Sequence, residues 1–347
     1  TGCSRHTGVL KPWPLSTDPI VFQDAFTGAV EFQAFGNSQL DALSTDNAEQ
    51  FEGTGCIRVT VPTSNYAGGA FVTAQPRDLT GYDALTFWAK ASRAVTVDVA
   101  GLGNDNTGTS KYEARRNAVP VTTTWTKVVV PIPLPARLTA ERGLFFFAAA
   151  PQGGSGYILW FDDVRFERLG TLANPRPAMT SQTLNTFVGA TASVSGTRTT
   201  FDLASGDSAV VGHMAGYFGF ASSDPAVATV ADGLIRVVGP GSAVVTARLD
   251  TLPATGAVTV NAAPFTPGHA PVPAVPAADV ISLFSNAYAN RTVDKWSADW
   301  DMAEVTSLSI EGDDIKLYTN LFYAGIEFTS SPVDASAMTH FHMDVWV

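Results

Sequence analysis

Short runs of β-forming residues, separated by Gly, Asn and Pro, recur along this chain, and strong helical periodicity is absent. Within residues 84–90, Leu85, Phe87 and Ala89 alternate with polar or aromatic side chains, so the two faces of a strand are distinguished. Many short strands at such spacing are typical of sandwiches and jelly rolls. We therefore predict an all-β fold made of tandem β-sandwiches. In the first half of the chain the runs occupy residues 56–61, 84–90, 95–99, 124–132, 144–148 and 157–166.

The charge balance argues against two classes of protein. Lys and Arg total 21 and Asp and Glu total 32, a formal net charge of −11, whereas nucleic-acid binding needs a basic surface that displaces counterions. The same balance argues against a basic membrane-surface protein. No uncharged run of apolar residues is long enough for a transmembrane helix. Because 45% of the 347 residues are hydrophobic, the chain can bury sizeable cores.

Two low-complexity joints divide the chain into units. The second joint is rich in Ala, Val and Pro, and a Pro-rich joint is extended and semi-rigid, so it spaces domains. The last unit is expected to be incomplete, because the chain stops in a strand-like alternation with no terminal turn. The predicted organisation is an extended segment at 1–17, a jelly roll at 18–168, a linker at 169–178, an immunoglobulin-like sandwich at 179–263, a Pro-rich linker at 264–278 and an incomplete β-sandwich at 279–347.

The two cysteines leave two interpretations open. Cys3 and Cys56 are compatible with one disulfide in a secreted protein. Residues 1–4 also resemble the end of a bacterial lipoprotein signal, which implies a lipid on Cys3 and a buried, inert thiol at Cys56. Under either interpretation we expect a protein that is secreted or held at a bacterial cell surface.

The usual motifs of catalysis do not occur in the sequence. It holds no G-x-S-x-G elbow, no H-E-x-x-H pair and no P-loop. His340 and His342 share one face of an expected strand, but no third metal ligand is evident, so we interpret them as a surface pair. We therefore do not expect this chain to be an enzyme.

Loop aromatics beside polar side chains are the best candidates for binding sugar. A pyranose ring can stack its C–H face on an aromatic platform, while polar groups set its orientation. In the jelly roll the candidates are Tyr66, Tyr112 and Arg115. Three other aromatics lie within apolar strands and are expected mostly in the core: Trp88, Trp125 and Trp160.

The last unit carries the sharpest binding candidate. Trp296 and Trp300 stand in one polar loop together with Asp299. Exposed Trp side chains are costly without a partner, so the pair predicts a carbohydrate site. The alternative is that the two Trp cap the end of the sandwich.

Two stretches of the chain resemble known domain families. Residues 220–247, FASSDPAVATVADGLIRVVGPGSAVVTA, resemble the group 2 bacterial Ig-like domain, which implies a spacer or adhesive stalk on a bacterial surface. The jelly roll is similar to the galactose-binding-like jelly rolls that serve as carbohydrate-binding modules. That resemblance is carried by YDALTFWAK (82–90), WTKVVVPI (125–132) and WFDDVRF (160–166).

The last unit resembles a module appended to laminarinase-like secreted glycoside hydrolases. The match runs over the whole of residues 279–347, and in those proteins the module continues further. It is carried by VISLFSNAY (280–288), WSADW (296–300), YTNLFYAGIEF (318–328) and MTHFHMDVW (338–346).

The jelly-roll resemblance also implies a structural Ca²⁺ between the first and last strands. Such an ion takes about six to eight oxygen ligands from carboxylates and carbonyls. Asp24 and Asp163 stand at the matching positions, with Glu52 as a further ligand. The alternative is an Asp163 that is hydrogen-bonded to the backbone.

Two hypotheses for function follow. The first is an extracellular multimodular carbohydrate-binding protein, or the non-catalytic part of a polysaccharide-degrading enzyme, with a polysaccharide or cell-surface glycan as partner. The second is a structural or adhesive surface protein, whose sandwiches associate with copies of the chain in a stalk, sheath or filament. Binding predicts aromatics in a groove with polar neighbours, whereas assembly predicts apolar patches or an unpaired edge strand. We favour the first.

Overall fold

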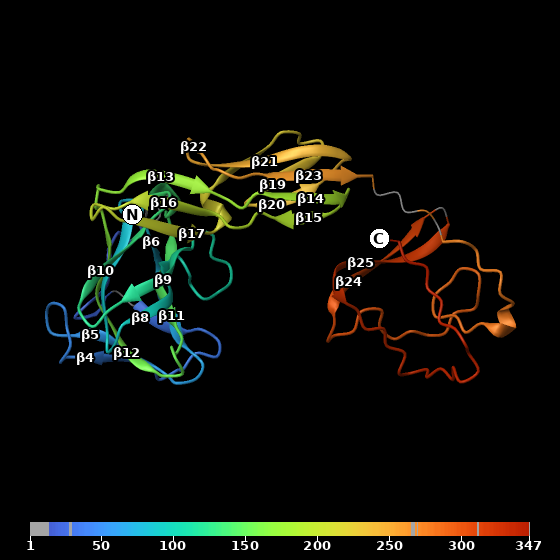
Figure 1. The fold of residues 1–347 in the computed structure, drawn as a ribbon, viewed down its shortest axis with the longest axis horizontal. Coiled ribbons are helices and arrows are strands. Elements are labelled where there is room, and N and C mark those ends of the chain that lie inside the picture. The colour runs from blue at the N-terminus through green and yellow to red at the C-terminus, as the bar shows by residue number, and fades with distance from the viewer. Residues whose placement is uncertain (1–13, 28–29, 265–267, 269, 311, 347) are drawn as a thin grey trace, which may run out of the picture. The chain divides into compact units, whose positions relative to one another are not determined.

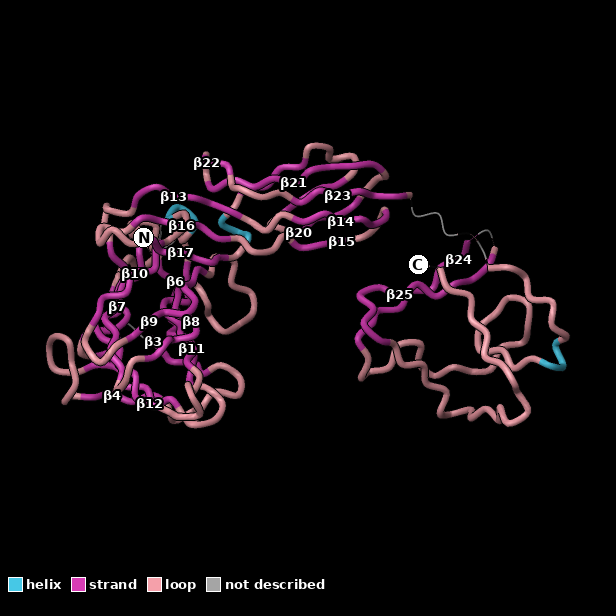
Figure 2. The backbone as a smooth tube through the Cα atoms, in the orientation of Figure 1, coloured by secondary structure: helices cyan, strands magenta, loops and turns pink. Residues whose placement is uncertain are grey.

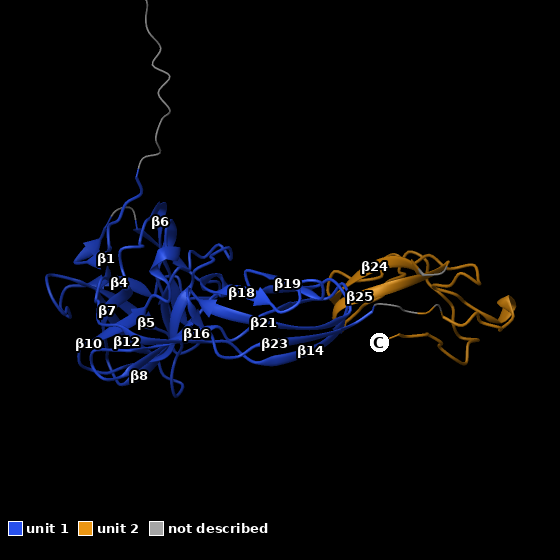
Figure 3. Cartoon of the chain, turned by 90° about the horizontal axis from the view of Figure 1, so that it is seen from above, with its two compact units in different colours: residues 1–264 blue, residues 265–347 orange. Residues whose placement is uncertain are grey.

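The computed structural model describes residues 14–27, 30–264, 268, 270–310 and 312–346, and strands dominate it (Figure 2). The prediction of an all-β fold built from β-sandwiches is confirmed. The chain divides into two compact units, residues 1–264 and 265–347 (Figure 3). In the described part of the chain no helix is long and apolar enough to cross a membrane. The helices described there are short 3₁₀ turns: η1 (Pro135–Arg137), η2 (Ala215–Tyr217) and η3 (Ala277–Asp279).

The first sandwich, residues 18–168, has one seven-stranded sheet among its described residues. Its central strand is β12 (Tyr157–Glu167), which pairs with β7 along one edge and with β5 and β1 along the other. The remaining strands are β10 (Thr126–Pro131), β7 (Ala84–Ala91), β1 (Ile20–Gln23), β2 (Ala25–Phe26), β5 (Cys56–Val61) and β4 (Leu43–Asp46).

The facing sheet contains eight strands in the described part of the chain. Five of them belong to the first sandwich, and three come from further along the chain (Figure 1). In spatial order they are β13 (Ala173–Ala178), β16 (Arg198–Asp202), β17 (Ser208–His213), β9 (Ala114–Val121), β8 (Val95–Leu102), β11 (Glu141–Ala149), β6 (Ala67–Arg77) and β3 (Val30–Ala34).

The two sheets of the first sandwich pack on a core of phenylalanine rings. Phe145 and Phe147 of β11 meet Phe87 of β7 and Phe161 of β12, and all four are at most 1% exposed. The ring centroids of Phe87 and Phe145 lie 5.1 Å apart, and those of Phe147 and Phe161 lie 5.0 Å apart. Each such pair contributes about 0.5–1.5 kcal/mol beyond its buried area. Because successive side chains of a strand point to opposite faces, Phe146 must leave this core.

The segment predicted as a linker at residues 169–178 contains a strand instead. Pro175 and Pro177 favour a linker in the sequence, because proline lacks the N–H that a β ladder needs. However, β13 is an edge strand that pairs only with β16 in the described sheet, and edge strands tolerate proline. The eight-stranded sheet therefore runs from the first sandwich into the following residues without a spacer.

The second sandwich lies within residues 179–263. Asp232 and Gly233, both with positive φ (47° and 81°), form the turn of one hairpin, and such mirror-image turns match the twist of paired strands. Its strands are β14 (Gln182–Phe187), β23 (Val258–Ala263), β21 (Gly241–Leu249), β18 (Gly219–Ser222) and β22 (Leu252–Pro253) in one sheet, and β15 (Thr191–Ser193), β20 (Leu234–Val237) and β19 (Ala228–Ala231) in the other.

The second sandwich joins the first through β16 and β17, which lie between its own strands β15 and β18 in the sequence and extend the eight-stranded sheet of the first sandwich. In β17, Gly212 and His213 pair with Arg115 and Ala114 of β9. His213 is 8% exposed, and its Nδ1 lies 3.0 Å from the carbonyl oxygen of Met214, so this nitrogen donates. Nε2 then accepts a hydrogen bond from the Thr199 hydroxyl at 3.0 Å. The imidazole is therefore held neutral inside the junction.

The C-terminal unit, residues 265–347, contains one antiparallel hairpin in its described part. The strands are β24 (Met302–Ile310) and β25 (Asp313–Tyr323). The loop before β24 is held by the Asp301 carboxylate, which accepts the N–H groups of Ala298 and Gly325, each at 2.9 Å. The predicted third sandwich at 279–347 remains an expectation.

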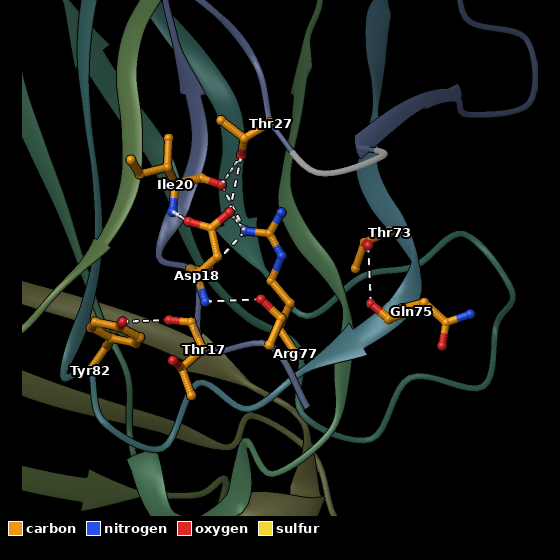
Figure 4. A network of polar contacts seen from close by, with 9 residues as sticks. Thr17, Asp18, Ile20, Thr27, Thr73, Gln75, Arg77 and Tyr82 are labelled. Carbon is orange, nitrogen blue, oxygen red and sulfur yellow. Dashed lines mark hydrogen bonds and ion pairs between the residues drawn. The ribbon is translucent and has the colours of Figure 1, made fainter. Parts of the chain in front are cut away.

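A buried arginine closes the first sandwich at its N-terminal strand (Figure 4). Arg77, at the end of β6, is 2% exposed, and its Nη1 donates to the carbonyls of Asp18 (2.9 Å) and Ile20 (2.7 Å). The Asp18 carboxylate lies 3.6 Å from the same nitrogen, and the Thr27 hydroxyl also donates to the Ile20 carbonyl, at 2.7 Å. The Tyr82 hydroxyl adds a bond to the carbonyl of Thr17 at 2.6 Å. One side chain thus links β1 of one sheet to β6 of the other.

Replacing this arginine should destabilise the first sandwich. Arg77→Met keeps most of the aliphatic volume but removes two hydrogen bonds and the nearby positive charge, and it leaves the Asp18 carbonyl without this donor, so the free energy of unfolding should fall by about 3 kcal/mol. The control is Arg142→Met on neighbouring β11, where the arginine is exposed and the loss should stay below about 0.5 kcal/mol. Urea unfolding of both variants measures the difference, and equal losses would contradict the assignment.

The junction should weaken in acid. Burial holds the pKa of His213 down at about 4, below its ordinary value of 6.5, so the neutral form stabilises the fold. This contribution is complete above pH 6.5 and is lost as the pH falls through 4, a change of about 3 kcal/mol. His213→Gln, which cannot titrate, should show a smaller loss of unfolding free energy between pH 7 and pH 4. Identical pH profiles for the two proteins would refute this role of His213.

Candidate functional site

The face of the eight-stranded sheet that points away from the core carries a second, smaller apolar cluster. Phe146 is 3% exposed and packs with Ala70 and Val72 of β6, which are also buried. Phe35, just after β3, and Val99 of β8 pack against these three. The rings of Phe35 and Phe146 meet edge to face with centroids 6.4 Å apart. An apolar floor thus lies on the outer face of the sheet.

A glycine on the neighbouring strand makes room for this floor. A Cβ atom at Gly101 of β8 would lie 2.8 Å from Cε1 of Phe146 and 2.3 Å from the carbonyl oxygen of Ala114. Since real Cβ contacts are longer than this, any side chain at Gly101 would displace the Phe146 ring. The absence of a side chain at Gly101 of β8 therefore leaves space for the Phe146 ring of the paired strand β11.

An open groove of about 560 Å³ runs over this floor. Apolar side chains form its base and polar side chains form most of its rim, the combination that suits a sugar ring. Most lining residues come from the first sandwich, and one comes from the second. They are Phe35, Tyr66, Val99, Asn104, Asn106, Gly108, Ser110, Glu113, Arg115, Asn117, Phe146, Ala148 and Met214.

The loop at residues 103–113 supplies much of the rim and is folded by its own side chains. The Asp105 carboxylate accepts hydrogen bonds from the hydroxyls of Thr107 (2.6 Å) and Ser110 (2.8 Å). Burial raises the pKa of Asp105, but these hydroxyl bonds outweigh it and leave the pKa below its ordinary value. The loop is therefore ordered around an ionised carboxylate before any ligand binds.

A chain of polar contacts continues along the rim. The Asn104 side-chain amide donates to Oε2 of Glu113 at 3.0 Å, and Oε1 of Glu113 pairs with Nη1 of Arg115 at 2.7 Å. Arg115 remains half-exposed, with the side chain 50% accessible. Because the guanidinium and the carboxylate neutralise each other, the rim offers hydrogen-bond donors and acceptors without a net charge.

The structure places two of the three residues predicted for the first sandwich in the groove. Tyr66 and Arg115 line it, and the Tyr66 hydroxyl donates to the carbonyl of Gly36 at 2.5 Å. Tyr112 does not line it: its ring packs against Tyr217 of the second sandwich, with centroids 5.5 Å apart. Sequence reasoning missed the floor, although the alternation in Phe145, Phe146 and Phe147 contains the signal for it.

Of the three tryptophans expected mostly in the core, Trp160 is buried (9% exposed) and Trp88 and Trp125 are partly exposed, but all three contact residues on the outer side of the seven-stranded sheet. Phe87 and Phe161 occupy the core positions next to Trp88 and Trp160, so strand alternation turns those two outward. Trp88 stacks on Phe51 with ring centroids 3.7 Å apart, and Trp125 meets the same Phe51 at 6.3 Å. Trp160 donates its Nε1–H to a carboxylate of β4 at 2.9 Å.

The residues predicted in the C-terminal unit do not form one platform. Trp300 is 62% exposed and stacks on Tyr323, with ring centroids 6.3 Å apart. Trp296 instead packs edge to face on Phe284, at 5.4 Å. Asp299 is exposed and forms an ion pair with a lysine four residues earlier. The pairing of Trp296 with Trp300 in one site therefore stays a prediction.

The predicted calcium ligands point to different partners. The Asp24 carboxylate accepts the backbone N–H groups of residues 54–55, and Asp163 pairs with Arg165 at 3.2 Å. Glu52 is exposed. Among the residues that the structure describes, no group of three or more His, Cys, Asp or Glu could hold a metal ion. The arrangement does not bring the three expected ligands together, and calcium binding stays a prediction.

Of the two cysteines, Cys3 lies outside the described residues. Cys56 carries a free, buried thiol that donates to the carbonyl of Glu49. Burial raises the pKa of this thiol to about 12, so it is an unreactive side chain at neutral pH. The choice between a disulfide and a lipid on Cys3 stays open.

Comparisons with solved structures give low overall similarity. A family 30 carbohydrate-binding module of a cellulosomal cellulase from Clostridium thermocellum is 18% identical, covers 44% of this chain and 95% of its own, and has a TM-score of 0.29. A family 11 module from the same organism, in complex with a β-1,3-1,4-mixed-linked tetrasaccharide, is 12% identical over 44% and 96%, with a TM-score of 0.32. A β-1,2-glucanase from Parabacteroides distasonis is 10% identical over 72% and 40%, also with a TM-score of 0.32. Such scores carry no argument about what this chain binds.

A family model gives the more informative match. Residues 18–168 match the family described as Carbohydrate binding domain 30, and these bounds enclose both the groove floor and most of its rim. No curated protein matches the chain. The family match covers less than half of the chain and supports a carbohydrate-binding jelly roll for the first sandwich.

Proposed function

We propose that the groove on the outer face of the eight-stranded sheet binds a chain of neutral sugars. The observation that carries the proposal is the pairing of an apolar floor, centred on Phe146, with an ordered polar rim. Around the buried Phe146 ring, the partly exposed side chains of Phe35, Val99 and Ala148 offer apolar surface to the C–H face of a pyranose ring, and the rim fits its hydroxyl groups. The match of residues 18–168 to a carbohydrate-binding family supports this assignment.

The rim favours a neutral sugar over an acidic one. Arg115 is the cation of the groove lining in the described residues, and Glu113 pairs with it at 2.7 Å. A uronate would have to separate this pair or bind beside Glu113, and either event opposes binding. A neutral hydroxyl can share the free acceptor and donor positions of the pair without breaking it.

The groove is open rather than enclosed, so it suits the interior of a polysaccharide better than a single terminal sugar. We infer that the protein works outside the cell as a non-catalytic part of a polysaccharide-binding or polysaccharide-degrading system. The first sandwich would then hold the protein on the polysaccharide. The rest of the protein would position this sandwich.

Binding should depend on the aromatic floor and on the rim. Phe35→Ala removes an apolar side chain of the floor, and Asn117→Ala removes a polar side chain of the groove lining. Each substitution should weaken binding to soluble neutral polysaccharides about tenfold, which corresponds to a loss of about 1.4 kcal/mol of binding free energy. The panel consists of hydroxyethylcellulose, mixed-linkage β-glucan and galactomannan, with polygalacturonate as the acidic comparison. Affinity electrophoresis of the full chain measures the retardation, which we expect to be weakest with polygalacturonate.

The matched control is Phe51→Ala on the opposite sheet, where the ring stacks on Trp88 and is 37% exposed. It should leave binding unchanged. If the unaltered protein binds none of the neutral polysaccharides, or if Phe51→Ala weakens binding as much as Phe35→Ala, the assignment of the groove is wrong. In the first case the structural or adhesive hypothesis becomes the better one.

A further inference from the structure

We propose that the glycan site is shared between two sandwiches, and that Met214 of the second sandwich is a specificity-determining contact for longer sugar chains. This inference rests on the proposed function of the groove. Met214 follows β17 directly, lines the groove together with Glu113 and Arg115, and is 42% exposed. The first sandwich alone cannot supply the contact, because β9 is its last strand on that side of the sheet.

The backbone of Met214 is fixed to the groove rim. Its N–H donates to the carbonyl of Glu113 at 3.0 Å, which continues the pairing of Gly212 and His213 with β9. The Glu113 side chain is in turn bonded to Arg115 at 2.7 Å. Glu113 therefore connects two parts of the groove lining. Its carboxylate binds Asn104 and Arg115 of the polar rim, and its backbone carbonyl binds the N–H of Met214.

The segment after Met214 interlocks with the rim loop. The Tyr217 ring is fully buried, and its hydroxyl donates to the carbonyl of Tyr112 at 2.7 Å. A Cβ atom at Gly216 would lie 2.6 Å from the carbonyl oxygen of Lys111, so the two backbones touch with no side chain between them. This close contact explains why Tyr112, predicted as a sugar ligand, serves the junction instead.

The chemistry of an exposed methionine beside a polar rim suits a sugar face. Its thioether is apolar and polarisable, and its three rotatable bonds let it adapt to the C–H face of a ring. Val210 within β17 is 52% exposed but does not line the groove. Exposure alone therefore does not distinguish Met214, but its place in the groove lining does.

Chain length should reveal this contact. Met214 follows β17, and β9 and β8 separate this strand from β11, which carries Phe146. We therefore expect a trisaccharide to be held over the floor near Phe35 alone, and a hexasaccharide to extend to Met214. In the full chain, Met214→Ala should weaken hexasaccharide binding about fivefold and leave trisaccharide binding unchanged. Met214→Leu, which restores an apolar side chain of similar volume, should recover most of the loss.

The experiment is isothermal titration calorimetry with cellotriose, cellohexaose, mannotriose and mannohexaose. Val210→Ala is the matched control and should bind all four like the unaltered protein, with thermal unfolding confirming that each variant is folded.

If the unaltered protein binds none of them, both the groove assignment and this inference fail. If Phe35→Ala weakens binding while Met214→Ala has no effect on either hexasaccharide, only the shared site is refuted. An equal loss for the trisaccharides and hexasaccharides would also refute it, because Met214 would then not act at the far end.

Discussion

The two-residue period of the β-strand governs both the core and the candidate site of the first sandwich. In β11 it sends Phe145 and Phe147 into the core and Phe146 to the opposite face, where it forms the groove floor. A shift of one residue in the pairing of this strand would exchange the two faces. The ring contacts to Phe87 and Phe161 resist such a shift, so the packing of the core also holds the site in place. Stability and binding are therefore properties of the same strand.

The continuity of the eight-stranded sheet is the second constraint. A jelly roll that ended at β9 would expose an unpaired edge, and such edges invite association with other chains. Here β17 covers part of that edge at Ala114 and Arg115, so the junction protects it and also orders the groove rim. The neutral His213 inside the junction explains why this arrangement should depend on pH although no ionisable group of the groove floor is involved.

Local patterns were sufficient for the fold class but not for long-range contacts. Alternation around Leu85 and Phe87 predicted strands with two distinct faces. Tyr66 and Arg115 were predicted as sugar-binding loop residues, and both line the groove, although Arg115 lies on β9 instead of a loop. Tyr112 has the same local character, but Tyr217, more than a hundred residues away, takes its ring into the junction. The strand at 173–178 escaped prediction because the tolerance of an edge strand for proline depends on its place in the sheet, which local sequence does not encode.

Order in the rim before binding bears directly on affinity. Each flexible side chain that a ligand must immobilise subtracts about 0.5–1.5 kcal/mol from binding. In this groove Asp105 already holds Thr107 and Ser110, and Glu113 already holds Asn104 and Arg115, so little of that loss remains. Met214 differs, because its backbone is fixed by a hydrogen bond whereas its side chain, with three rotatable bonds, is 42% exposed. The rigid rim would discriminate between sugars by the positions of the hydroxyl groups on the ring that lies above the floor. The adaptable Met214 side chain would tolerate different sugars further along the bound chain.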